Sequence, residues 1–267
     1  MDMKPGIYYD LPREEYDAIE AANWSRIRHM LRSAAHYQAE LARPHDSPSM
    51  AFGRIAHELI LEGRRNFVVG GPVNLKTGKP FGAETKAFAE WAALQDAPVL
   101  SVEDAAHLDR MQAALSANDT ATTILGDTRR EVTVVWVHPE TGTPCKCRID
   151  AAYVTDEEDE DDYVLDYKTC EDASYDVFRW DVKKRLYAAQ LAMYADGLAT
   201  VACGSPLAYI VAQEKSPPYG VASYLLGTAM LDLGRKKYQA ALRSYAECVK
   251  TGRWPAYPDQ VQLFEID

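Results

Sequence analysis

The residues best suited to chemistry in this sequence lie in two short segments, 147–150 and 165–169. Alternate residues of a β-strand point to the same face, so Asp166 and Lys168 would project together. Mg²⁺ is usually held by one or two carboxylates, with waters and substrate phosphate completing an octahedral shell. Asp150 and Asp166 are therefore candidate metal ligands, and Lys168 could orient a water or stabilise developing negative charge. This set of groups is suited to metal-assisted cleavage of a phosphodiester.

Three strands are expected to position these groups. Residues 131–137 are rich in β-branched side chains and tryptophan, which favours a strand, and residues 144–153 read as the returning strand of a hairpin. A turn at 155–162, acidic throughout 156–162, leads to a third strand at 163–169. Asp150 and Asp166 would then lie on adjacent strands of an antiparallel meander.

The rest of the chain is predicted to be mainly helical. Asn23 or Ser25 can cap a helix that runs to about Leu41, and a long helix over 175–198 is expected to be interrupted near Asp181. Further helices are predicted at 49–62, 83–94, 102–117 and 229–250, and further strands at 207–213 and 220–226. The fold class is α/β (α+β), with a mixed central sheet flanked by helices.

Length and composition fit one domain spanning residues 1–267. The 267 residues are 47% hydrophobic and 26% charged, which allows a sizeable core. A helical N-terminal portion, about 1–125, would precede a core at about 126–267. No apolar run is long enough to cross a bilayer, and the N-terminus does not resemble a signal peptide. The expected location is the cytoplasm of a bacterial or phage-infected cell.

Cysteine spacing and net charge limit which metal clusters and which binding partners the chain could have. The five cysteines include no Cys-x-x-Cys pair, which argues against a disulfide framework, a zinc ribbon or an iron–sulfur cluster. A net charge of −11 argues at first against nucleic acid, but phosphate binding depends on local basic surface. Basic residues do cluster, at 26–32, 64–65, 183–185 and 235–237, and each cluster could equally be an ordinary helix surface.

Five ordered motifs resemble the phage and prophage exonuclease family typified by the C-terminal nuclease domain of exonuclease VIII, within the PD-(D/E)xK superfamily. The matching segments are 52–59 (FGRIAHEL), 147–150 (CRID), 165–169 (LDYKT), 187–194 (YAAQLAMY) and 213–219 (QEKSPPY). The Asp-x-Lys triplet is weak alone, but the ordered set Gly-x-x-x-His, Asp, Asp-x-Lys and Gln-x-x-x-Tyr is specific. The resemblance implies a restriction-endonuclease-like PD-(D/E)xK core.

The resemblance also assigns roles to single residues. His57 would be a metal ligand through neutral imidazole, which suits Mn²⁺ better than Mg²⁺. Asp150 and Asp166 would hold the metal, together with the backbone carbonyl of Tyr167. Lys168 would position or activate the attacking water. The implied cofactor is Mg²⁺, with Mn²⁺ able to substitute and no iron–sulfur cluster.

Two further residues would support the site or contact the substrate strand. Gln190 and Tyr194 lie at i and i+4 and so share one helix face. A partly buried polar pair on a core-facing helix is the alternative reading. Glu131, at the start of its strand, could also lie near the metals. The chain departs from the family in having Ile149, where proline often precedes the first carboxylate.

By resemblance, the function is that of a processive 5′-to-3′ exonuclease. It would degrade linear double-stranded DNA from its ends, release 5′-mononucleotides and leave 3′ single-stranded tails for a single-strand annealing recombinase. Family members form rings that enclose DNA, so a homo-oligomeric ring is implied, and no membrane is involved.

Other functions stay open at this stage. An endonuclease or a repair nuclease could use the same core, because the direction of digestion depends on what blocks the DNA-binding groove. A catalytically silent module that binds DNA ends or docks a recombinase could retain the fold, although the intact Asp150, Asp166 and Lys168 argue against it. A metal-binding protein without a nucleic-acid substrate would not explain Lys168.

Overall fold

A six-stranded sheet forms the centre of the molecule. The computed structural model describes residues 3–42, 48–82, 84–155, 161–261 and 263. The strand order is β1-β4-β5-β6-β7-β8, and only β6 and β7 are parallel to each other. The strands are β1 (Gly6–Tyr8), β4 (Arg129–Val137), β5 (Pro144–Tyr153), β6 (Tyr163–Cys170), β7 (Leu207–Glu214) and β8 (Val221–Leu225). The expected mixed sheet is confirmed.

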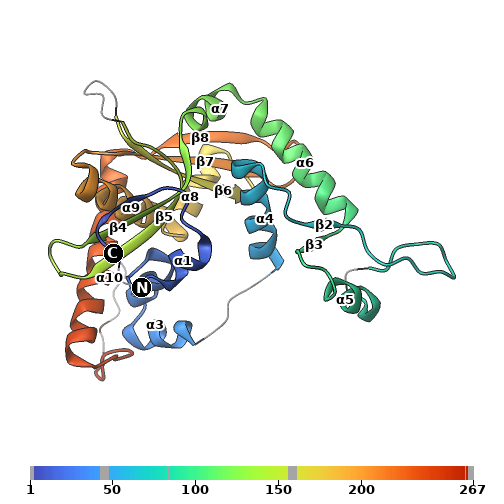
Figure 1. Ribbon diagram of the computed structural model, residues 1–267. Coiled ribbons are helices and arrows are strands. Elements are labelled where there is room, and N and C mark those ends of the chain that lie inside the picture. The colour runs from blue at the N-terminus through green and yellow to red at the C-terminus, as the bar shows by residue number, and fades with distance from the viewer. Residues whose placement is uncertain (1–2, 43–47, 83, 156–160, 262, 264–267) are drawn as a thin grey trace.

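Helices cover both faces of this sheet (Figure 1). Along the chain they are α1 (Arg13–Ala18), α2 (Trp24–Ile27), the 3₁₀ helix η1 (Arg28–Leu31), α3 (Ala34–Leu41), α4 (Pro48–Glu62), α5 (Lys86–Ala92), α6 (Val102–Ser116), α7 (Asp119–Gly126), α8 (Tyr175–Lys184), α9 (Tyr187–Ala202) and α10 (Thr228–Thr251). On one face α9 packs across β4 to β7, and α10 packs on α9. On the other face, α4, α6 and α7 supply Leu61, Leu115 and Leu125 to a smaller cluster.

The apolar content of these elements explains the two layers. The α9 helix carries a nearly continuous run of small and aliphatic side chains, most of them buried. Such a helix is stable only where other elements surround it, and here the sheet and α10 do so. Away from the sheet, β2 (Val68–Val69) and β3 (Val99–Leu100) form a short parallel pair, with α5 beside it (Figure 1).

Two predicted helices are broken in the structure. The helix expected from Asn23 to Leu41 is three short pieces, because Ser33 is extended and its side chain caps α3 by accepting from the His36 amide. The helix expected over 175–198 ends at Lys184 and restarts at Tyr187. Its break lies at Leu186, which has a φ of 61°, and not near Asp181.

The predicted strands and one predicted helix cap are confirmed. The strands expected at 131–137, 144–153, 163–169 and 207–213 match β4 to β7 within two residues at each end, and the cap at Ser101 of α6 is present. Strands β1 and β3 and helix α7 were not predicted. Most of the acidic turn, residues 156–160, lies outside the described residues. In the part of the chain described, no helix is both long and apolar enough to cross a membrane.

Candidate active site

Three carboxylates form a row across neighbouring strands. The register of β4 and β5 places Glu131 opposite Asp150. The pairing of β5 with β6 stops at Ala151, which lies opposite Leu165. The same register extended by one position brings Asp150 beside Asp166. Like charges directly opposite each other destabilise a sheet. This row therefore needs a reason other than the stability of the sheet.

The sheet is locally opened at this row. On the N-terminal side of Ala151, β5 forms no pairs with β6 among the described residues. The Asp150 carboxylate accepts the Tyr167 amide hydrogen at 2.8 Å instead. Side-chain alternation also breaks there, because Ile149 and Ala151 belong to hydrophobic clusters on opposite faces of the sheet. Opening the strands turns the Asp150 carboxylate toward β6 and α4.

Helix α4 brings His57 to this opening. The His57 Nε2 atom lies 3.2 Å from Asp150 Oδ2 and 3.1 Å from the backbone carbonyl oxygen of Tyr167. Octahedral coordination with bonds of about 2.1 Å separates adjacent ligand atoms by about 3 Å. The imidazole, carboxylate and carbonyl thus already have the mutual spacing of adjacent ligands of one such cation.

Asp166 and Lys168 lie together beside this group. The Lys168 Nζ atom is 2.6 Å from Asp166 Oδ2 and 5.0 Å from the centroid of the Tyr187 ring. The expectation that β6 projects both residues to one face is met. Asp166 is almost fully buried, and its Oδ2 atom is satisfied by the lysine charge but accepts no well-aligned hydrogen bond among the described residues. That oxygen can therefore bind a cation.

Helix α9 contacts the other oxygen of the Asp166 carboxylate, the one that Lys168 does not contact. The Gln190 side-chain amide donates to Asp166 Oδ1 at 3.1 Å and contacts the Tyr194 hydroxyl at 3.4 Å. These contacts fix which way the carboxylate faces. Of the two predicted roles for Gln190 and Tyr194, the geometry favours bracing of the site.

The charges of the site are strongly linked. Burial lowers the pKa of His57, but the neighbouring Asp150 carboxylate outweighs burial and raises that pKa to about 9. Burial also raises the pKa of both aspartates. His57 and Lys168 reverse this effect for Asp150, whereas Asp166, pressed against Asp150, keeps a raised pKa. Burial lowers the pKa of Lys168, but Asp166 and Asp150 outweigh burial and raise it, so Lys168 is a cation. A divalent cation would relieve the carboxylate repulsion and compete with the proton for the His57 imidazole nitrogen.

Glu131 is the third member of the carboxylate row. Its φ of 52° is unusual for a residue within a strand, and such strain tends to accompany functional sites. Arg148 forms an ion pair with it and also donates to the Leu11 carbonyl. The ligand atoms of His57, Glu131 and Asp150 all lie within 4.8 Å of one another. A second cation, or a water bound to the first, would find an acidic partner here.

These donors fit a hard divalent cation. Carboxylate and carbonyl oxygens are what Mg²⁺ and Mn²⁺ prefer, and one imidazole shifts the preference toward Mn²⁺. His57, Asp150, Asp166 and the Tyr167 carbonyl are therefore the residues that would hold such a cation. The site as a whole offers paired carboxylates, one partly buried cationic lysine and an opening between strands.

A basic pocket adjoins the site through Tyr187. Its volume is about 310 Å³, and its lining comes from η1 and from the α8–α9 junction: Arg28, His29, Arg32, Lys184, Arg185, Leu186 and Tyr187. Two basic clusters that are far apart in the sequence thus meet on one surface. Because the Tyr187 ring also contacts Lys168, this basic pocket lies one side chain away from the candidate catalytic lysine.

Sequence reasoning missed some of these contributions. Glu131 was named only as a residue that could lie near the metals, because its place in the row depends on the β4–β5 register. Tyr187 lay within a recognised motif, yet no role was given to it. An aromatic residue three positions before Gln190 on one helix was the available signal, since both would face β6.

The comparisons with known proteins agree with this fold. A family model described as "PDDEXK-like domain of unknown function (DUF3799)" matches residues 23–266. The crystal structure of a protein described as "Putative exonuclease" from Eubacterium rectale is similar with a TM-score of 0.63 and 12% identity, covering 97% of this chain and 97% of that chain. At that identity the likeness concerns the fold alone. The SSO0001 structure has a TM-score of 0.27 and 16% identity, and the match covers 51% of this chain and 57% of that chain. No curated protein matches the sequence.

Proposed function

This chain belongs to the PDDEXK-like domain family, and we propose that it is a divalent-metal-dependent deoxyribonuclease. The family and the fold support a nuclease of the PD-(D/E)xK superfamily in general. The observation that carries the proposal is the convergence of Asp150, Asp166, Lys168 and His57 at the opening between β5 and β6. A phosphodiester hydrolase needs a cation site and a nearby positive group, and this opening offers both.

In this proposal the side chains have separate roles in metal binding and in catalysis. His57, Asp150, Asp166 and the Tyr167 carbonyl would hold Mg²⁺, with Mn²⁺ able to substitute. When bound, the cation would supply Lewis acidity toward the phosphate and a lowered pKa for a coordinated water. Lys168, held between Asp166 and the Tyr187 ring, would orient the attacking water by hydrogen bonding and stabilise negative charge on the phosphate.

The basic pocket supports a nucleic-acid substrate. Arg28, Arg32, Lys184 and Arg185 gather beside Tyr187, although the chain as a whole is acidic. Local basic surface is what drives binding to a phosphate backbone. In our proposal the substrate strand passes from the metal donors over Tyr187 into the basic pocket, so that its other phosphates meet these cations while one phosphate is cleaved.

The finer activity is a 5′-to-3′ exonuclease on linear double-stranded DNA. It would release 5′-mononucleotides and leave 3′ single-stranded tails for a recombinase, and copies of the chain would associate around DNA to make digestion processive. The ordered motifs support an exonuclease, and the Eubacterium rectale protein of similar fold is itself described as a "Putative exonuclease".

Digestion of end-labelled DNA tests the proposal. Linear duplex labelled separately at its 5′ and 3′ ends is incubated with Mg²⁺, Mn²⁺ or EDTA, with closed circular DNA as the control. We expect 5′-labelled mononucleotides from linear DNA only, lost with EDTA and with Asp166→Asn. Cleavage of the circle would make the protein an endonuclease. Binding of DNA ends without cleavage under any metal condition would make it a silent docking module and refute the catalytic assignment.

A further inference from the structure

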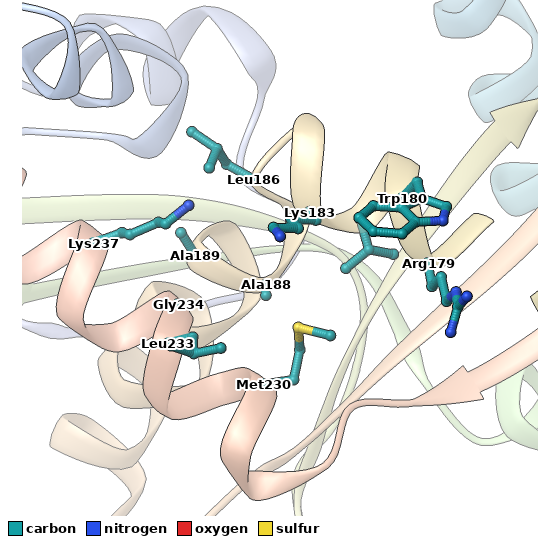
Figure 2. Close-up of a pocket in the computed structure, with 11 residues that line it drawn as sticks. Arg179, Trp180, Lys183, Leu186, Ala188, Ala189, Met230, Leu233, Gly234 and Lys237 are labelled. Carbon is teal, nitrogen blue, oxygen red and sulfur yellow. The ribbon is translucent and has the colours of Figure 1, made fainter. Parts of the chain in front are cut away.

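An apolar groove lies between α8 and α10, next to the basic pocket, with which it shares Leu186. It consists of two adjoining pockets of about 500 and 410 Å³ that share Arg179, Val182, Met230 and Leu233. Figure 2 shows the larger pocket, with Trp180 and Met230 beside it. We call the two pockets together the α8–α10 groove.

The α8–α10 groove exposes large apolar side chains that a monomer would normally cover. Trp180 and Leu233 are each 58% exposed, and Tyr175 and Leu225, which line the second pocket, are also exposed. Exposed apolar residues gathered around a concave surface mark an interaction site more often than single scattered ones do. At its base α9 and α10 pack closely, because a Cβ at Gly234 would clash with the Ala188 carbonyl.

All charged side chains that line the α8–α10 groove are positive. They are Arg179, Lys183 and Lys237, and none of the described lining residues is acidic, although the chain carries a net charge of −11. Arg179 and Lys183 both lie over the Trp180 ring, at 5.5 and 5.4 Å from its centroid. Lys183 and Lys237 form no ion pair with other described residues. The fitting occupant is an apolar segment that carries carboxylates.

The chain contains one segment with this chemistry beyond α10. Residues 261–267 read Val-Gln-Leu-Phe-Glu-Ile-Asp, which joins four large apolar side chains to the carboxylates of Glu265 and Asp267. In the single chain, Val261 is fully exposed and Leu263 is 83% exposed. Both the α8–α10 groove and the described residues of this segment are thus open within one molecule.

We propose that the α8–α10 groove of one copy binds residues 261–267 of a second copy. Apolar side chains of the segment would cover Trp180, Met230 and Leu233, and Glu265 and Asp267 would meet Lys183 and Lys237. The contact joins different surfaces of the two copies, so it is heterologous and can build a closed ring or a filament. The contact would supply the surfaces for the association of copies that the proposed function includes, on which it rests, and it does not require nuclease activity.

Peptide binding is the first test. A labelled peptide of residues 258–267 is titrated with protein lacking residues 261–267, and fluorescence anisotropy is measured. We expect saturable binding, weakened at least about tenfold by Lys183→Glu with Lys237→Glu. The matched control, Lys236→Glu with Lys250→Glu, changes the net charge equally on exposed α10 positions outside the α8–α10 groove and should leave binding unchanged.

A charge exchange in the full chain is the second test, read by sedimentation at several protein concentrations. We expect self-association of the unaltered chain, its loss with Lys183→Glu and Lys237→Glu or with Glu265→Lys and Asp267→Lys, and its return when all four substitutions are combined. Return of association cannot come from a folding defect.

Several results would overturn the proposal. These are absence of peptide binding, equal weakening by the control pair, or association that persists without residues 261–267. A full chain that stays monomeric while the peptide binds would place the segment on its own groove. Displacement of the peptide by duplex DNA, together with a monomeric chain, would make the α8–α10 groove a DNA surface.

Discussion

Adjacent residues of β6 take part in two buried polar groups of opposite character. On one face, Tyr167 donates its hydroxyl hydrogen to Gln213 at 2.6 Å, and Gln213 donates to the Met111 carbonyl at 2.7 Å. On the other face, Asp166 lies beside a second carboxylate and a lysine, and one of its oxygens lacks a well-aligned hydrogen bond among the described residues. In the first group the side chains satisfy one another's hydrogen-bonding capacity. In the second group one carboxylate oxygen is left without a well-aligned hydrogen bond among the described residues.

This difference distinguishes a polar group that stabilises the fold from one that is suited to binding a cation. Buried polar groups are normally hydrogen-bonded, so the Tyr167–Gln213 pair needs no ligand to explain it. Crowded carboxylates whose pKa values are shifted in opposite directions, by contrast, are typical of functional sites. Tyr167 serves both groups, because its hydroxyl belongs to the first and its backbone carbonyl faces the second. Substitutions should therefore separate loss of activity from loss of stability.

The largest effect is expected for Asp166→Asn. Loss of a ligand charge should reduce DNA cleavage by about a thousandfold or more. The free energy of unfolding of the metal-free protein should change little, because relief of the repulsion from Asp150 offsets the lost charge pairing with Lys168. The matched control is Asp196→Asn, since Asp196 accepts hydrogen bonds from Arg235 and Tyr238. That substitution should lower stability and leave cleavage per folded molecule unchanged; the reverse pattern would contradict the assignment.

Lys168→Met should have the next largest effect. Removal of the ammonium group should lower the cleavage rate about 10²- to 10³-fold, because no other cation lies against Asp166 among the described contacts. Metal affinity, measured by Mn²⁺ titration, should persist. Lys236→Met, at an exposed position on α10, serves as the control. Equal loss of metal binding and cleavage would mean that Lys168 acts only by holding Asp166 in place.

His57→Ala should weaken metal binding more than it slows the chemical step. We expect at least about a tenfold rise in the metal concentration needed for half-maximal cleavage, with recovery at saturating metal. His107→Ala is the control, because His107 is hydrogen-bonded to the Tyr219 hydroxyl outside the site. If excess Mn²⁺ or Mg²⁺ failed to restore any activity, His57 would have a role other than that of a ligand.

The smallest effect on activity is expected for Tyr167→Phe. Its backbone carbonyl remains, so metal affinity and cleavage per folded molecule should not change. Gln213 loses a buried partner, and the free energy of unfolding should fall by about 1–3 kcal/mol, measured by urea denaturation. Lost cleavage at full stability would show that the two faces of β6 are not independent.

Local sequence signals were enough for much of the sheet. The β-branched runs of β4 and the turns after β4 and β5 located the strands that carry Asp150 and Asp166. Breaks in helices were harder to predict. Leu186 adopts a left-handed conformation that leucine rarely takes, so only tertiary packing can impose it. Strand β1 has three residues and depends on pairing with β4, which is distant in sequence.

The residues of the candidate site could be named from the sequence, and their roles stay predictions, whereas their arrangement could not be predicted. Periodicity alone put Asp166 and Lys168 on one face, and the resemblance added His57. The sequence could not reveal that Glu131 lies opposite Asp150, because this depends on strand register. Nor could it show that the basic residues near Arg28 and those near Lys184 meet beside Tyr187, since helix packing brings them together.

The most direct test of the account is to locate Mn²⁺ by its anomalous scattering in crystals of this protein. We predict a peak within bonding distance of His57 Nε2, the Asp150 and Asp166 carboxylates and the Tyr167 carbonyl oxygen, absent in crystals of Asp166→Asn. A well-occupied peak elsewhere, with none between β5 and β6, would contradict the claim that this opening is a metal site.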